Sequence, residues 1–221
     1  MPTMKPLLAA LLLLAGCAAP PVPPAPPSPA PNTSYLEAAA AGTPVYRIDP
    51  TASQITVVVR SGGPFAKIGH DHAIASRTIS GYAAPAQGRS DFAFRLDELT
   101  VDEPAVRAQA GLTGSVPADA VAGTRANMLG RVLDAGRHPV VQLRVTGNQP
   151  TPRLSITLHG VTRSIDVPTA LHVTPDRLTA AGQFTLRQTD FGITPMSVLG
   201  GALVVKDEVE LQFRIQATRV R

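Results

Sequence analysis

The stretch VELQFRI, residues 209–215, alternates apolar and polar side chains without a break. Successive side chains of an extended chain point to opposite faces, so Val209, Leu211 and every second residue after them share one face. The stretch RLSITLH, residues 153–159, repeats the pattern with Leu154 on the apolar face. Both stretches predict half-buried β-strands.

Similar alternation recurs along the chain, and Gly, Pro, Asn or Asp separates several of these runs. Many antiparallel strands with few long helical patterns indicate an all-β sandwich or barrel. Alternation alone does not choose between these two architectures. The other expected strands are residues 55–59, 92–96, 141–145 and 184–186.

Residues 102–136 depart from this pattern, because Ala, Gly and Pro are common there and the alternation stops. Asp119 lies near the amino end of a set of residues at helical spacing, where its charge complements the helix dipole. We expect one or two short helices that cross one end of the sheet, either as a lid over an opening or as a plug. The residues at helical spacing are Ala118, Val121, Ala122, Arg125, Met128 and Leu129.

The composition is that of one globular domain: 221 residues, of which 44% are apolar and 16% are charged. Lys and Arg outnumber Asp and Glu by only 20 to 16, and this excess is too small to predict nucleic-acid binding. Ser76 and Ser80 lie near histidines in the sequence, but no nucleophile motif surrounds them. Because phosphate-loop, paired-carboxylate and CxxC patterns are also missing, we do not expect an enzyme.

The first residues predict secretion. Lys5 precedes the apolar run PLLAALLLLAG, which is too short for a stable membrane span and ends in small residues. We therefore expect a signal peptide at residues 1–16. Leu14-Ala15-Gly16-Cys17 resembles the bacterial lipoprotein box, in which the signal is cleaved before the cysteine and that cysteine is acylated.

Cys17 is the only cysteine, which excludes an intramolecular disulfide as a competing role. Its acylation would anchor the protein to a membrane in the periplasm, and Ala18 in place of an aspartate resembles outer-membrane sorting. The alternative is a simple signal peptide with a chance cysteine near its end. We expect residues 17–42 to be the lipidated cysteine and a Pro/Ala-rich tether, and residues 43–221 to be the folded domain.

A series of motifs, in order along residues 44–218, resembles the YceI-like family of bacterial polyisoprenoid-binding proteins. The resemblance implies an eight-stranded antiparallel barrel, similar to a lipocalin, with a short helical segment at one end. It also implies an interior tunnel that holds the apolar chain of an isoprenoid lipid such as a quinone tail. The motifs are YRIDP at 46–50 with Ser53, residues 125–129 and 132–134, His138-Pro139, LHGVTR at 158–163, and TDFGI at 189–193.

Candidate tunnel-lining residues follow from strand face and position, although Val58 interrupts the alternation of its strand. The same apolar lining would suit an ordinary packed core, so a solid barrel that serves as a structural or interaction module is an alternative function. Met128 and Leu129 are candidates to cap the opening. The lining candidates are Ile55, Val57, Val59, Phe92, Phe94 and Leu96.

Two of the motifs also have structural interpretations. His159-Gly160 joins two strand patterns, which predicts a hairpin turn there. Asp190-Phe191-Gly192 is typical of a bend after a strand, with Asp190 bonding local backbone. Family members often carry an arginine two positions before this aspartate, whereas this chain has Gln188 there.

The stretch KIGHDHAI, residues 67–74, places His70 and His72 on one face if it is extended. The pair could chelate a metal ion, contact a quinone headgroup at the barrel mouth, or bond to backbone carbonyls. A metal would require at least one further ligand. The candidates for it are His138, His159, His172 and Asp190.

The sequence therefore predicts a lipid-anchored periplasmic protein that binds and sequesters or carries an isoprenoid lipid, with no cofactor besides that ligand. A metal-binding or redox-accessory barrel that uses His70 and His72 is the second alternative. The sequence does not predict the oligomeric state.

Overall fold

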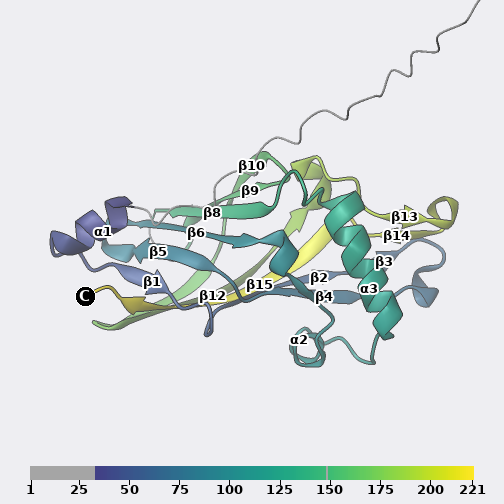
Figure 1. Cartoon of the computed structure of the whole chain (residues 1–221), viewed down its shortest axis with the longest axis horizontal. Coiled ribbons are helices and arrows are strands. Elements are labelled where there is room, and N and C mark those ends of the chain that lie inside the picture. The colour runs from purple at the N-terminus through teal and green to yellow at the C-terminus, as the bar shows by residue number, and fades with distance from the viewer. Residues whose placement is uncertain (1–32, 148) are drawn as a thin grey trace, which may run out of the picture.

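The fold is built from antiparallel strands, as the alternating stretches predict (Figure 1). The computed structural model describes residues 33–147 and 149–221, and these contain one twelve-stranded and one three-stranded sheet. The expected signal peptide and Cys17 lie outside the described residues. No helix within the described ranges is long and apolar enough to cross a membrane.

The strands of the large sheet include every stretch at which alternation predicts a strand. They are β1 (Tyr46–Ile48), β2 (Gln54–Val59), β4 (His72–Ser76), β5 (Ser80–Ala84), β6 (Arg89–Arg95), β7 (Thr100–Val101), β8 (Val140–Thr146), β9 (Arg153–Leu158), β10 (Val161–Asp166), β11 (Thr169–Val173), β12 (Arg177–Arg187) and β15 (Glu208–Arg219). The small sheet contains β3 (Ser61–Gly62), β13 (Ser197–Val198) and β14 (Leu203–Val205).

The helices are short. They are α1 (Thr33–Ala40), α2 (Pro104–Gln109), α3 (Ala118–Asn127), the π-helical turn η4 (Met128–Val132), and the 3-10 turns η1 (Ala66–Ile68), η2 (Pro85–Gln87), η3 (Leu96–Glu98), η5 (Gln188–Phe191) and η6 (Leu199–Gly201). The helix α3 and the turn η4 lie where the spacing of residues 118–129 predicts a helix, and α2 lies earlier in the same segment. Figure 1 shows α3 at the end of the sheet away from α1.

The strand β15 is the centre of the large sheet. One edge pairs with β12 along its length, and the other edge pairs first with β2 and then with β1. Its backbone groups are therefore satisfied on both sides. The alternation that starts at Val209 places every second side chain on the inward face of the sheet, and Ile215 at the end of this stretch is buried.

The expected eight-stranded barrel is not confirmed, because the sheet has twelve strands and is not closed. Along the described residues, β10 pairs with β9 and β11 pairs with β12, whereas β10 does not pair with β12. Only Val167 and Pro168 separate β10 from β11 in the chain. Proline has no amide hydrogen to donate, which suits a point where one extended segment changes its pairing partner.

The second face of β2 and β4 is also covered, and this explains why Val58 breaks the alternation of its strand. Val58, Ala73 and Ala75 are fully buried in a cluster with Val106 of α2 and Leu112. Strands with two buried faces show continuous apolar runs instead of alternation.

The folded domain includes residues before Thr43, the position at which it was expected to start. Residues 33–40, assigned to the tether, form α1, and its Tyr35 is completely buried. The Tyr35 ring stacks on Tyr82 with centroids 5.8 Å apart, and its hydroxyl donates to Asp91 Oδ2 at 2.9 Å. The Arg89 guanidinium lies 4.1 Å from the ring centroid. Burial and then the Asp91 carboxylate raise the pKa of Tyr35 well above its usual value.

Replacing Tyr35 with alanine should lower the free energy of unfolding by about 3 kcal/mol, because it removes a fully buried aromatic side chain and its hydrogen bond. Leu36→Ala is the matched control: its side chain is on the same helix and exposed, and the change should stay within about 0.5 kcal/mol. Urea denaturation of both variants measures the difference. Equal effects would show that α1 is not docked through Tyr35.

Candidate functional site

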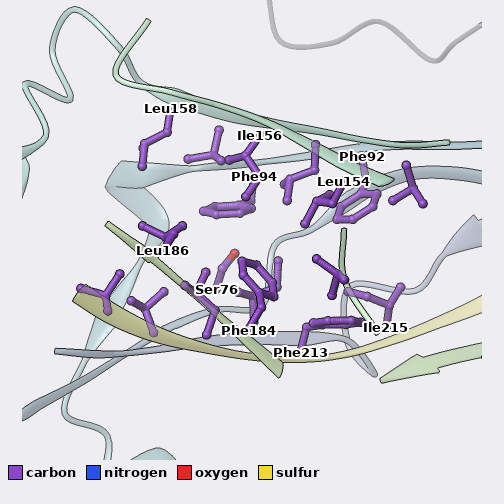
Figure 2. A pocket seen from close by; sticks show the side chains of 18 of the residues that line it. Ser76, Phe92, Phe94, Leu154, Ile156, Leu158, Phe184, Leu186, Phe213 and Ile215 are labelled. Carbon is purple, nitrogen blue, oxygen red and sulfur yellow. The ribbon is translucent and has the colours of Figure 1, made fainter. Parts of the chain in front are cut away.

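The large sheet surrounds a cavity of about 660 Å³, which is lined mainly by the apolar side chains on its inward face. This volume is typical of sites that hold small organic ligands, about 300–1,000 Å³. Figure 2 shows side chains from opposite sides of the cavity facing one another, with Phe94 and Ile156 across from Phe184 and Phe213. The residual space does not fit the alternative of a solid barrel.

The wall follows directly from strand alternation, because the lining residues are alternate positions on the long strands. They include Val141, Leu143 and Val145 of β8, Leu154, Ile156 and Leu158 of β9, Leu178, Ala180, Phe184 and Leu186 of β12, and Val209, Leu211, Phe213 and Ile215 of β15. The lining residues predicted from strands lie only in the stretches 55–59 and 92–96. The same signal, the apolar face of each alternating run, identifies these others as well.

The sequence-predicted lining residues lie where they were expected. Met128 lies on the wall and is buried, at the start of η4. Contact between these lining residues and a ligand stays a prediction. The six strand-derived candidates on the wall are Ile55, Val57, Val59, Phe92, Phe94 and Leu96.

The prediction that Leu129 caps the opening is corrected, because its side chain is not part of the cavity wall. It is only partly buried and packs against the core beside the cavity. Consecutive residues of a helical turn point in different directions, so Met128 and Leu129 do not face the same space.

One buried polar atom faces the apolar interior. Ser76 of β4 is 1% exposed and lines the cavity, and Figure 2 shows its hydroxyl pointing inward. Among the described residues, none forms a hydrogen bond with its Oγ. A buried hydroxyl without a protein partner is available to a polar atom of a guest molecule.

His72 brings a second polar group to the cavity wall, at the first residue of β4. Its Nδ1 lies 2.6 Å from Asp102 Oδ2, and its Nε2 lies 3.4 Å from Thr124 Oγ1 of α3. Nδ1 donates to the carboxylate, and Nε2 faces the Thr124 hydroxyl. Thr124 and Asn127 of α3 also line the cavity, so this end carries several polar groups.

Asp102 holds His72 in this orientation and is itself buried. Its Oδ1 accepts from the Ala73 amide at 3.0 Å and from Arg107 Nη1 at 2.7 Å. Burial alone would raise the pKa of Asp102, but the hydrogen bonds from His72, Ala73 and Arg107 outweigh it and hold the pKa below its usual range. The carboxylate is therefore a fixed negative charge beneath the histidine.

The condition under which His70 and His72 would share one strand face is not met. Residues 66–68 form η1, and β4 begins only at His72, so the segment is not extended through His70. His70 is exposed and is not part of the cavity wall, although its ring centroid is 6.2 Å from that of His72. Asp71 between them accepts from the Ser61 amide at 2.8 Å and pairs with Arg60, which are structural roles.

The proposed metal site at His70 and His72 gains no further ligand in the part of the chain that the structure describes. The group there that could hold a metal is elsewhere and combines Asp134 with His138 and His159. His172 lies on β11, and Asp190 lies in η5. Thus two of the four candidate third ligands come together, but with each other instead of with His72.

The predicted turn and the predicted bend are both present, since η5 follows β12 and ends at Gly192 with a φ of 70°, and only the role of Asp190 is corrected. His159 and Gly160 form the two-residue turn between β9 and β10, and both have positive φ, as in a type I′ hairpin. At the second motif, Asp207 and not Asp190 accepts from the Thr189 amide, at 2.9 Å. The side chain of Gln188 is buried on the cavity wall and donates to the Lys206 carbonyl.

A family model described as YceI-like domain matches residues 46–217 of this chain. The structure is similar to that of BcnA from Burkholderia cenocepacia, with a TM-score of 0.55 and 16% identity, over 77% of this chain and 99% of that chain. A YceI protein from Campylobacter jejuni is 10% identical, with a TM-score of 0.42 over 62% of this chain and 77% of its own. Among curated proteins, no sequence matches.

Asp102→Asn should lower the free energy of unfolding by about 3 kcal/mol at pH 7, because it weakens a buried charge network that holds Arg107. The pKa of Asp102 is depressed on folding, so its contribution is present above the unfolded value of 3.8 and is lost as pH falls through the lower folded value. The difference between the proteins should therefore shrink as pH falls from about 7 to about 2.

Urea denaturation across this pH range measures the effect of Asp102→Asn. Asp97→Asn is the control, since Asp97 is more than half exposed and pairs with exposed Arg95, and its effect should stay below about 1 kcal/mol. A difference for Asp102→Asn that does not change with pH would contradict the assigned role of its charge.

Proposed function

Since the chain belongs to the YceI-like family, we propose that it binds an isoprenoid-type lipid, a quinone or a polyprenol, inside its sheet. The family is a family of binding proteins that take isoprenoid-type ligands, and not a family of enzymes. The observation that carries the proposal for this chain is the apolar cavity of about 660 Å³. We propose that the protein sequesters or carries the lipid without converting it.

The physical basis is the transfer of an apolar chain between two apolar environments. Exposing an apolar chain to water costs about 0.8 kcal/mol per CH₂ group. A cavity lined by residues such as Leu154, Phe184 and Phe213 offers the chain surroundings similar to the bilayer interior. Movement from the membrane to the protein then costs little, while the chain stays shielded from water.

The polar groups of the cavity support a place for the headgroup. His72, Thr124 and Asn127 lie together on the lining, and Asp102 fixes the orientation of the His72 ring. We place the carbonyl or hydroxyl oxygen of the ligand at this end, beside α3. The remaining lining is mainly aliphatic and aromatic, apart from the Ser76 hydroxyl and a few other polar residues.

The side chains of Asp102, His72 and Thr124 are in contact in that order, which is the spatial arrangement of an acid, a base and a hydroxyl nucleophile. Thr124 Oγ1 is 3.4 Å from His72 Nε2, slightly more than the distance of about 2.6–3.2 Å usual for a nucleophile and its base, a distance that is often longer without substrate. The surrounding cavity wall is mainly aliphatic and aromatic. This geometry favours contact with a headgroup over acyl transfer.

Replacing Ala180 with phenylalanine should lower lipid binding about tenfold or more, because the new ring would extend from β12 into the cavity. Ala181→Phe is the matched control: it is the next residue on the same strand, is not part of the wall, and should leave binding unchanged. Native and denaturing mass spectrometry of the gently purified proteins measures bound lipid, and its mass separates quinone from polyprenol.

The lipid-binding proposal fails if the unmutated protein carries no lipid and takes up neither a quinone nor a polyprenol from vesicles. Equal loss of lipid in Ala180→Phe and Ala181→Phe would place the ligand outside the cavity. Circular dichroism of both variants checks that the sheet is retained.

We also propose that acylated Cys17 anchors the protein to the periplasmic side of a membrane, with the outer membrane favoured by the sorting pattern. Cys17→Ser should move the protein from the membrane fraction to the soluble periplasmic fraction, because the acyl chains that bury methylene groups in the bilayer are lost. Cell fractionation with immunoblotting measures the change. Membrane retention of the Cys17→Ser protein would contradict anchoring through this residue.

A further inference from the structure

Asp134, His138 and His159 come together away from the cavity wall. Each offers a ligand atom, and these atoms all lie within 4.8 Å of one another. Asp134 and His138 belong to the connection between η4 and β8, whereas His159 is in the β9–β10 turn. All three side chains are half-buried. Neither the lipid site nor the His72 network uses any of them.

Local backbone geometry creates this juxtaposition. Asp134 has a φ of 43°, and its carbonyl accepts from the amides of Arg137 and His138, both at 2.9 Å. This tight turn directs the chain from η4 back towards β8. His159 has a φ of 53° in the type I′ turn, so its position is also set by the backbone.

Gly160 makes room for the second imidazole. A Cβ atom at this position would lie 2.9 Å from His138 Cε1, and its φ of 75° also favours glycine. The ring centroids of His138 and His159 are 5.0 Å apart as a result. The turn therefore does more than reverse the chain, because it brings two imidazoles into contact.

His138 and His159 each have a ring nitrogen that is available to bind a metal ion. His159 Nδ1 lies 3.3 Å from the Phe191 carbonyl, and donation to this oxygen fixes the tautomer in which Nε2 keeps a lone pair. Metal-bound histidines are commonly oriented by such a bond on the other nitrogen. Among the described residues, none forms a hydrogen bond with the His138 ring.

Asp134 is similarly free to act as a ligand. Its carboxylate pairs with Arg137 at 3.6 Å, and the Arg137 side chain is 73% exposed. An exposed ion pair of this kind contributes little and can be exchanged for a stronger partner. The Arg137 side chain can move into solvent when a cation approaches the carboxylate.

We propose that Asp134, His138 and His159 form a binding site for a divalent transition metal, with Zn²⁺ as the best match. Two imidazoles and one carboxylate, with water in the fourth position, are a ligand set that zinc uses in proteins. Magnesium and calcium prefer all-oxygen sites and do not fit this set. Zinc bonds of about 2.0–2.2 Å would draw the three ligand atoms closer together.

A metal here would join two parts of the fold that are distant in sequence. It would link the connection that follows α3 and η4 to the turn at the end of β9. Because α3 and η4 contribute Thr124, Asn127 and Met128 to one part of the cavity wall, the metal would steady the segment that covers this part. Metal binding to the folded state alone raises stability by mass action.

Titration of Zn²⁺ into the purified, chelator-treated chain tests the site. The protein must carry an affinity tag without histidine, and isothermal titration calorimetry reports affinity and stoichiometry. One Zn²⁺ per chain is expected, together with a thermal midpoint that rises with zinc concentration. His138→Gln, Asp134→Asn and His159→Asn should each lower the affinity about a hundredfold or more.

The variants at 134 and 159 use asparagine because it tolerates the positive φ found at both positions. His172→Gln is the matched control, since His172 is exposed on β11 outside the cluster, and its zinc affinity should equal that of the unmutated chain. Circular dichroism without zinc confirms that each variant is folded. The proposal is overturned if the unmutated chain binds no zinc, or if the three variants bind it as tightly as the control.

Discussion

The structure depends on the pairing of β15 with three other strands. Its hydrogen bonds to β12 on one edge, and to β2 and β1 on the other, join strands that are far apart in the sequence. Because pairing fixes the register, a shift by one residue would turn Leu211 and Phe213 away from the interior. The inward face of β15 is apolar throughout. The side chains that point inward from opposite sides of the sheet do not meet, and the cavity is the space left between them.

Polar chemistry is added to this apolar interior without leaving an uncompensated buried charge. Asp102 is buried, but His72, Arg107 and the Ala73 amide all donate to it. A buried carboxylate with several donors stays ionised and holds its partners rigidly. The fold can thus present one oriented imidazole to the cavity, whereas an unsupported charge there would oppose the burial of an apolar guest.

The fold and the cavity wall were predictable where local pattern determines them. Val57 and Phe94 lie on the wall because side-chain direction in a strand follows from the period of two. The partners of a side chain were not predictable, since they come from distant positions. Asp102 reaches His72 from 30 residues away, and Tyr35 reaches Asp91 from 56 residues away. No periodic signal records such contacts.

The change of partner between β10 and β11 has a mechanical consequence. Val167 and Pro168 carry the chain from β10, which pairs with β9, to β11, which pairs with β12, and η5 contacts both β10 and β12. The part of the sheet that ends in β10 and the part that contains β11 and β12 are the two arms. They are joined by the chain at Val167 and Pro168 and by the packing of buried Phe191, without backbone hydrogen bonds between β10 and β12. Spreading these arms would disturb the packing of Phe191 and the contact between His159 Nδ1 and the Phe191 carbonyl, but it would break no strand pair, so this seam is the place where the width of the interior can change at least cost in backbone hydrogen bonds.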